Sequence, residues 1–234
     1  MSTDKDILIL AIETSTDICS VALSRNGKTL DSETVSEPRM QTSRLAPMIE
    51  ELLKRNGLTV KDCAAVAVSS GPGSYTGLRV GVSMAKGLCF GAGIPLIGVG
   101  TLDLLAAQGK AGCGEKPDFI VPMIDARRME VYQAVFDGNG IRTGEISPKI
   151  LDSSSYSELP AGSRVLFCGN GCEKFRDTCG ISNAIFAPYS PLAEYMSQLA
   201  YLKFTSSELE DTAYMEPFYL KEFTIGTYKK KILG

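Results

Sequence analysis

Two continuous apolar runs constrain the fold more than any other feature of the sequence. They are ILILAI at residues 7–12 and AAVAVSS at residues 64–70. Neither run alternates between apolar and polar side chains, so each predicts a strand that is buried on both faces. Strands of this kind, interspersed with helical patterns, favour an α/β protein in which helices cover a sheet.

The first apolar run is followed by a predicted meander. Glu13 ends the run, residues 14–17 form a polar turn, and residues 18–23 and 28–35 have the composition of two further strands. The Asn26-Gly27 dipeptide between them is a strong hairpin signal, because both residues tolerate positive φ. We therefore expect three antiparallel strands at the start of the chain.

Helical patterns alternate with the next strands. Apolar side chains recur at one-face helical spacing in residues 44–55, where Gly57 can end the helix and Pro47 should start or bend it. Residues 76–92 predict a second helix, residues 95–99 a strand, and the residues from Thr101 onward a third helix. In the second half, we expect strands at 119–124, 130–136 and 164–168 and a helix at about 191–204.

The order of elements predicts two lobes of similar plan. The glycine-rich segment GKAGCG at 109–114, with Pro117 soon after it, is the best candidate for the boundary between them. We predict an N-terminal lobe at residues 1–108 and a C-terminal lobe at 109–234, with the last segment packing back on the first lobe. The expected fold class is therefore α/β with two lobes.

The most decisive fact of composition is that none of the 234 residues is histidine. This removes the commonest general base, the Ser-His and Cys-His nucleophile pairs and the commonest transition-metal ligand. Any catalysis would have to rest on carboxylates, lysines or a bound cation. A metalloprotease of the HExxH type is excluded, and we predict no catalytic residue and no metal site.

Cysteine content indicates a cytoplasmic protein, and charge bears on nucleic-acid binding. The seven cysteines form no CxxC pair, and the sequence shows neither a signal peptide nor an apolar run of about 20 residues that could span a membrane. The net charge of −3 argues against a chain that binds nucleic acid by neutralising many phosphates on its own.

The stretch SSGPGSYTGLRVG at residues 69–81 is the first candidate functional segment. A glycine-rich turn between a buried strand and a helix N-terminus can bind an anion through its backbone N–H groups. The stretch lacks the lysine of a Walker loop and is not GxGxxG. Because Gly77, Gly81 and Ala85 recur at a spacing of four, close approach of another backbone is the favoured alternative.

Two further turns carry suggestive side chains. The turn Glu13-Thr14-Ser15-Thr16 can face phosphates. The alternative is a purely structural turn, because serine and threonine side chains favour turns. In IDARRMEVY at 124–132, Asp125 and the two arginines Arg127 and Arg128 can serve a phosphate or a partner carboxylate, because arginine offers a planar fork of donors. Asp125, Arg127 and Glu130 are predicted to form a structural or functional turn. The favoured alternative there is an intramolecular Asp–Arg or Arg–Glu pair that fixes the turn.

The helix at 44–55 is a candidate association surface. Core packing explains such an apolar stripe by default, but exposure of Leu45, Met48, Ile49 and Leu52 would make it a patch for another protein. We expect that charged residues in place of Leu45 and Met48 leave the monomer folded and abolish pairing.

Taken together, several of these segments resemble the TsaB (YeaZ) family. The resemblance is carried by ILAIETSTDICSVAL, by SSGPGSYTGLRVGVSMAKGL at 69–88, by PLIGVGTLDLLA at 95–106, by IDARRMEVY and by EPFYLK at 216–221. These segments occur in the expected order from about Ile7 to Lys221. One departure is Gln41, which stands where many family members have a histidine.

The resemblance implies a bilobal fold of the actin, sugar-kinase and Hsp70 type, with a mixed five-stranded sheet in each lobe. It also implies a non-catalytic subunit that supports its paralogue TsaD in forming N6-threonylcarbamoyladenosine at position 37 of tRNAs reading ANN codons. The implied partners are TsaD, the ATPase TsaE and, through the complex, tRNA, with a homodimer in isolation.

The family further implies sites on this chain. The interface for TsaD or for self-association is expected on the helices at 44–55 and 76–92, at Arg44, Leu45, Met48, Ile49, Leu52, Leu53, Val80, Met84 and Leu88. No cofactor is expected apart from weak binding of ATP or ADP at Glu13, Thr14, Ser15, Gly71, Gly73, Ser74, Thr76 and Gly77. The alternative function is an ATP-dependent small-molecule phosphotransferase of the same superfamily, with Glu13 and Asp125 in metal and base roles.

Overall fold

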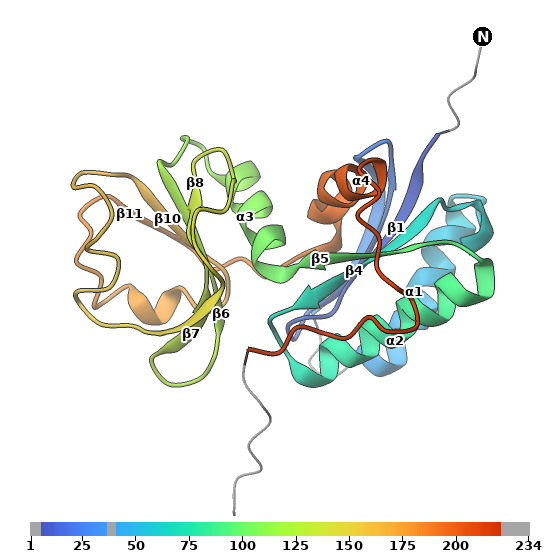
Figure 1. Cartoon of the computed structure of the whole chain (residues 1–234), viewed down its shortest axis with the longest axis horizontal. Coiled ribbons are helices and arrows are strands. Elements are labelled where there is room, and N and C mark those ends of the chain that lie inside the picture. The colour runs from blue at the N-terminus through green and yellow to red at the C-terminus, as the bar shows by residue number, and fades with distance from the viewer. Residues whose placement is uncertain (1–5, 37–40, 221–234) are drawn as a thin grey trace, which may run out of the picture.

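A computed structural model describes residues 6–36 and 41–220 and shows two lobes side by side, each built on one sheet (Figure 1). The first sheet has the strand order β3-β2-β1-β4-β5. Its strands are β1 (Leu8–Glu13), β2 (Cys19–Arg25), β3 (Lys28–Val35), β4 (Ala65–Gly71) and β5 (Leu96–Gly100). The predicted meander is confirmed, because β1 pairs antiparallel with β2 and β2 with β3, whereas β1, β4 and β5 are parallel.

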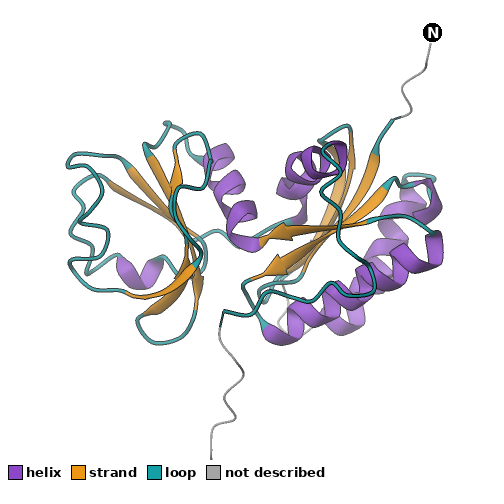
Figure 2. Ribbon diagram, in the orientation of Figure 1, coloured by secondary structure: helices purple, strands orange, loops and turns teal. Residues whose placement is uncertain are grey.

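Helices cover both faces of the first sheet (Figure 2). On one face, Leu10 and Ile12 pack with α1 (Gln41–Arg55) and α2 (Tyr75–Ala92). On the other face, Ile9 and Ala11 pack with residues of the 3-10 helix η3 (Ala193–Met196) and of α4 (Ser197–Thr205). The continuous apolar runs are therefore explained, since alternate side chains of β1 enter two different cores.

The second lobe holds a six-stranded sheet, one strand more than the five expected, with the order β11-β10-β6-β7-β9 and with β8 paired to β6 off this path. One face is covered by α3 (Thr101–Gly112), whose Leu102 and Leu105 pack with Ile120 of β6. The other face is an aromatic cluster that includes Tyr156, Phe167 and Phe175. The strands are β6 (Phe119–Asp125), β7 (Glu130–Gln133), β8 (Phe136–Asp137), β9 (Ser147–Ile150), β10 (Val165–Cys168) and β11 (Ala184–Ala187). Two further 3-10 helices are η1 (Val60–Asp62) in the first lobe and η2 (Glu173–Phe175) in the second.

The chain returns to the first lobe after β11. Ser20 Oγ accepts a hydrogen bond from Ala193 N at 2.9 Å, and a bridge joins Leu96 of β5 to Glu210. Residues 206–219, which we call the C-terminal segment, then run along β5 and α2 (Figure 1). The boundary predicted at 108/109 falls inside α3, and the division into domains stays a prediction.

Several element boundaries differ from expectation. The strand expected at 130–136 is divided into β7 and β8, and the helix expected at 191–204 begins as the 3-10 turn η3. Helix α1 begins at Gln41, six residues before Pro47, so the proline does not start it. Within residues 6–36 and 41–220, no helix is both long enough and apolar enough to cross a membrane.

Candidate functional site

Glu13 lies at the carboxyl end of β1, beside the end of the parallel strand β4, where ligands bind in many open α/β sheets. Its side chain is fully buried, and Oε1 accepts a hydrogen bond from Ser15 N. Burial raises the pKa of the Glu13 carboxyl to about 7, although hydrogen bonds from Ser15 and Ser69 oppose the increase. A carboxyl group with this pKa can gain or lose a proton near neutrality.

The turn after Glu13 packs directly against the glycine-rich stretch. Ser74 N donates to Ser15 O at 2.6 Å, and Thr14 Oγ1 donates to Gly77 O at 2.7 Å. A Cβ atom built at Gly73 would overlap Ser15, and one at Gly77 or Gly81 would overlap Thr14. The predicted close backbone approach is therefore confirmed at Gly77, where the approaching segment is the Thr14–Ser15 turn, whereas at Gly81 the neighbour is the Thr14 side chain.

This packing uses the N–H groups that an anion would need. Ser74 N is bonded to Ser15 O, and Gly77 N donates to the Ser74 side chain, which caps α2, at 3.2 Å. The residues expected to bind nucleotide do lie together, because the Thr14–Ser15 turn touches the stretch from Gly73 to Gly77. Nucleotide binding itself stays a prediction.

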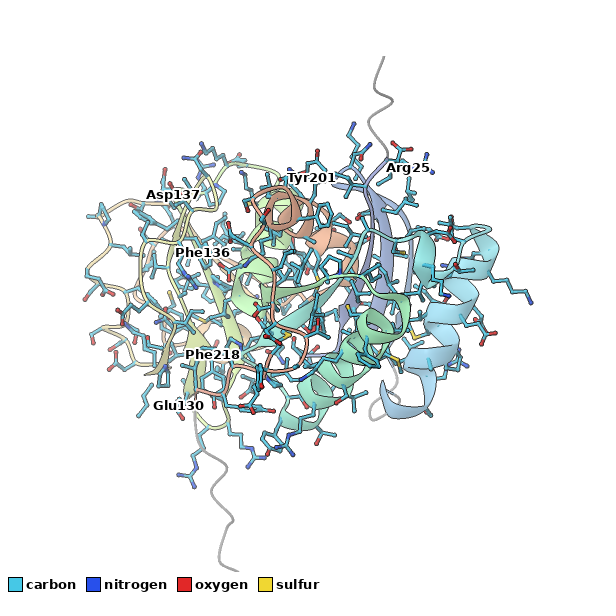
Figure 3. The ribbon with its side chains drawn as sticks, turned by 45° about the vertical axis from the view of Figure 1, so that its right-hand side comes forward. Arg25, Glu130, Phe136, Asp137, Tyr201 and Phe218 are labelled. Carbon is cyan, nitrogen blue, oxygen red and sulfur yellow. The ribbon has the colours of Figure 1, made fainter. Side chains whose placement is uncertain are left out.

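The C-terminal segment closes over the same stretch. Phe218 N donates to Ser70 O at 2.7 Å, and a Cβ atom at Gly71, where φ is +107°, would overlap Phe218 O. The ring centroids of Tyr219 and Tyr75 are 4.8 Å apart. Figure 3 labels Phe218 near the end of this segment. The sequence marked EPFYLK as a family motif but gave no sign that it contacts the glycine-rich turn.

The apolar stripe of α1 faces inward. Leu45, Met48 and Leu52 have no exposed surface, and Ile49 and Leu53 are 4% exposed, all within the core formed with β1 and β2. The expectation that charged residues at Leu45 and Met48 leave the monomer folded is wrong, because a charge there would be buried without a partner. These side chains lie inside the lobe, not on its surface.

A groove nevertheless lies between α1 and α2. Its volume is about 630 Å³, and its apolar lining comes from Ala46, Ile49, Leu53, Leu58, Val60, Met84 and Leu88, with Glu50 and Lys54 at its polar edge. Met84, Leu88, Val80 and Arg44 are half-buried, so each has surface available to a partner. Whether the groove is an interface stays a prediction.

The turn between β6 and β7 is held by a residue that the sequence analysis missed. Lys174 Nζ donates to Asp125 Oδ1 at 2.7 Å, to Arg128 O at 2.7 Å and to Glu130 O at 3.1 Å. Arg127 contributes its backbone N–H, which donates to Asp125 Oδ1 at 2.6 Å. Among the described residues, the ion pair that fixes Asp125 is therefore with Lys174 and not with an arginine. The sequence did not indicate this pair, because Lys174 and Asp125 are 49 positions apart.

Comparison with known proteins places this geometry in context. A family model described as "TsaD: tRNA N6-adenosine threonylcarbamoyltransferase" matches residues 38–201. The "tRNA threonylcarbamoyladenosine biosynthesis protein TsaB" of Escherichia coli (strain K12) is 35% identical over 223 residues, covering 91% of this chain and 94% of that protein.

Solved structures agree with the fold. The structure "YeaZ from Pseudomonas aeruginosa" has a TM-score of 0.79 at 29% identity, covering 92% of this chain and 100% of that chain. An activator of 2-hydroxyisocaproyl-CoA dehydratase from Clostridium difficile, with bound ADPNP, has a TM-score of 0.50 at 13% identity, covering 88% of this chain and 98% of that chain. The second likeness concerns the fold alone, and the predicted bilobal α/β fold is confirmed.

Proposed function

We propose, from the premise that the chain belongs to the TsaB family, that it takes part in tRNA threonylcarbamoyladenosine biosynthesis as a non-catalytic subunit. In this proposal it supports TsaD in forming N6-threonylcarbamoyladenosine at position 37 of tRNAs reading ANN codons, in the cytoplasm. The observation that carries the proposal is the similarity to named TsaB proteins over nine-tenths of the chain. The absence of histidine supports the non-catalytic role, because the chain has no imidazole to act as a base or a metal ligand.

The groove between α1 and α2 supports the choice of partner surface. It is apolar at its centre and carries one acidic and one basic side chain at its edge, as protein interfaces commonly do. We propose that TsaD docks on this face and that a second copy of the chain occupies it when TsaD is absent. TsaE and tRNA then join through the assembled complex.

The test is reconstitution of the modification from purified components. The chain, its TsaD and its TsaE are mixed with tRNA, and threonylcarbamoyl transfer to the tRNA is measured with each protein left out in turn. We expect transfer to be lost when this chain is omitted and to return when it is added back. Full transfer without the chain would overturn the proposal.

Nucleotide binding is a separable part of the proposal. We expect ATP and ADP to bind weakly at the turn formed by Glu13, Gly73 and Gly77, because the N–H groups of Ser74 and Gly77 already have acceptors. Calorimetry on the isolated chain measures this directly. Tight binding together with phosphoryl transfer to a small molecule would instead favour the phosphotransferase alternative.

A further inference from the structure

A second cavity lies at the junction of the two lobes, away from the groove between α1 and α2. Its volume is about 630 Å³, within the usual range for small-molecule sites. The end of β5 and the first turn of α3 form one side, α4 forms another, and Arg142 of the second lobe reaches in from the loop between β8 and β9. In Figure 3, Tyr201 of α4 and Asp137 at the end of β8 mark the two lobes that meet here.

Charged side chains of both signs line this cavity. Asp103 lies in the first turn of α3, Arg142 Nη1 is 3.9 Å from Asp103 Oδ2, and Lys203 Nζ of α4 is 3.7 Å from Glu208 Oε2. Val99, Leu199 and Leu202 supply an apolar surface beside them. Small-molecule sites commonly have this make-up of an apolar wall with a few converging polar groups.

The ion pairs in the cavity are longer than hydrogen bonds. Elsewhere in the chain, Arg55 and Lys174 approach their carboxylate partners to 2.6 and 2.7 Å. The separations of 3.9 and 3.7 Å in the cavity exceed the range in which an N–H donates to an oxygen. The Arg142 and Lys203 head groups therefore have donors left for a ligand.

The carboxylate of Asp103 is also placed to receive a cation. Burial raises the pKa of Asp103, and the nearby charges of Arg142 and Lys203 only partly oppose the increase. The Asp103 side chain is 34% exposed, and its ion pair with Arg142 is 3.9 Å long. A ligand ammonium group could therefore reach the carboxylate and form a closer contact with it.

Hydrogen bonds order the backbone of the loop that carries Arg142. Asp137 Oδ1 accepts hydrogen bonds from Asn139 N and Ile141 N, both at 2.9 Å, and a bridge joins Arg142 to Phe136. On the other side, Ser206 Oγ donates to Leu202 O at 3.0 Å, which fixes the end of α4 beside Lys203. Held loops on both sides reduce the ordering that binding would require.

We propose that the cavity between Asp103, Arg142 and Lys203 binds a small α-amino acid as its zwitterion. The ligand carboxylate contacts Arg142 and Lys203, its ammonium group contacts Asp103, and a side chain of modest size lies against Leu199 and Leu202. Because the contacts come from both lobes, the bound ligand holds the lobes together. This site is independent of the proposed role in tRNA modification.

The test is calorimetry on the isolated full-length chain with the standard L-amino acids at millimolar concentration. Each amino acid that binds is compared with its N-acetyl derivative, which lacks the ammonium charge, and with its amide, which lacks the carboxylate. We expect the free amino acid to bind at least tenfold more tightly than either derivative, because each modification removes a charge-assisted contact. Inorganic phosphate is the control ligand, because it is an anion that has no ammonium group.

Substitutions at Asp103 and Arg142 test which side chain contacts the ammonium group and which contacts the carboxylate of the ligand. In Asp103→Asn, N-acetylation should no longer weaken binding. In Arg142→Gln, amidation should weaken binding less than in the original chain, because only the Lys203 contact to the carboxylate remains. Arg25→Gln is the matched control, because Arg25 also makes a long pair, 3.4 Å to Asp6, with a half-exposed side chain, and lies on the first lobe away from the junction (Figure 3). Circular dichroism confirms that each variant is folded.

Three outcomes would overturn the proposal. The first is that no standard amino acid gives heat, and the second is that phosphate binds while amino acids do not. The third is that Arg25→Gln weakens binding as much as Arg142→Gln, which would place the ligand elsewhere. The expected result is preserved binding in Arg25→Gln, no effect of N-acetylation in Asp103→Asn and a smaller effect of amidation in Arg142→Gln.

Discussion

At the scale of single residues, the glycines of α2 divide into two kinds. A Cβ atom at Gly77 would overlap Thr14, whereas one at Gly87 would meet nothing within 4 Å. We expect Gly77→Ala to lower the free energy of unfolding by about 1–3 kcal/mol through overpacking. Gly87→Ala should raise it by up to about 1 kcal/mol, because alanine favours the helix. Urea unfolding of both variants measures this contrast, and equal changes would contradict it.

Glu13 should make stability depend on pH. Its pKa is raised from 4.5 to about 7 on folding, so its stabilising contribution is complete below about pH 4.5 and is lost as the pH rises through about 7. Glu13→Gln cannot ionise, and it should therefore be more stable than the original chain by about 3 kcal/mol above pH 7. Near pH 5 the free energies of unfolding of Glu13→Gln and of the original chain should differ little.

Urea unfolding at pH 5 and pH 8 measures the effect of Glu13→Gln. Glu51→Gln, on the exposed surface of α1, is the control and should change stability little at either pH. A stability difference for Glu13→Gln that is the same at both values would show that burial of a charge is not its cause.

The sequence anticipated one part of this site and missed another. The spacing of Gly77 and Gly81 indicated a closely approaching backbone, because glycines at that spacing leave a smooth helix face. It did not indicate that the approaching segment is the Thr14–Ser15 turn, or that Phe218 covers Gly71. Those contacts join residues more than 50 positions apart, and no local pattern records them.

At the scale of elements, the groove between α1 and α2 yields a prediction about docking. Met84 and Leu88 are half-buried at the groove, so a charge at either position meets solvent and should leave the lobe folded. Met84→Glu and Leu88→Glu should reduce TsaD binding in a pull-down by at least tenfold, since each would place an unpaired charge in an apolar contact. Ser83→Glu, on the exposed side of α2, is the control. Undiminished binding by both groove variants would show that TsaD docks elsewhere.

Elements with strong local patterns were predictable, and weak ones were not. The buried strands β1 and β4 have continuous apolar runs, and α1 and α2 have clear helical character. By contrast, β9 is the four-residue segment SPKI with a proline inside it, and β11 is only AIFA. Such short strands form because neighbouring strands pair with them, and this tertiary context overrides weak propensity.

At the scale of the whole molecule, the first lobe depends on the end of the chain. Ala193, Met196 and Ala200 cover one face of its sheet, and Met215 enters the core on the other face. A fragment comprising residues 1–112 would expose both places to water. We expect this fragment to unfold without cooperativity in urea, and co-expression with residues 191–234 should restore a cooperative transition. A cooperative transition in the fragment alone would contradict this dependence.

The hydrogen bond from Phe218 N to Ser70 O ties the last described part of the chain to the end of strand β4. The amide of Ser74, bonded to Ser15 O, lies on the turn that follows this strand. Exposure of the Phe218 amide requires the C-terminal segment to leave β4, whereas exposure of the Ser74 amide requires the Thr14–Ser15 turn to separate from the glycine-rich stretch, so the two belong to separate local opening events. Their protons should therefore exchange with deuterium independently, and a partner that lifts the C-terminal segment would speed exchange at Phe218 while leaving exchange at Ser74 unchanged.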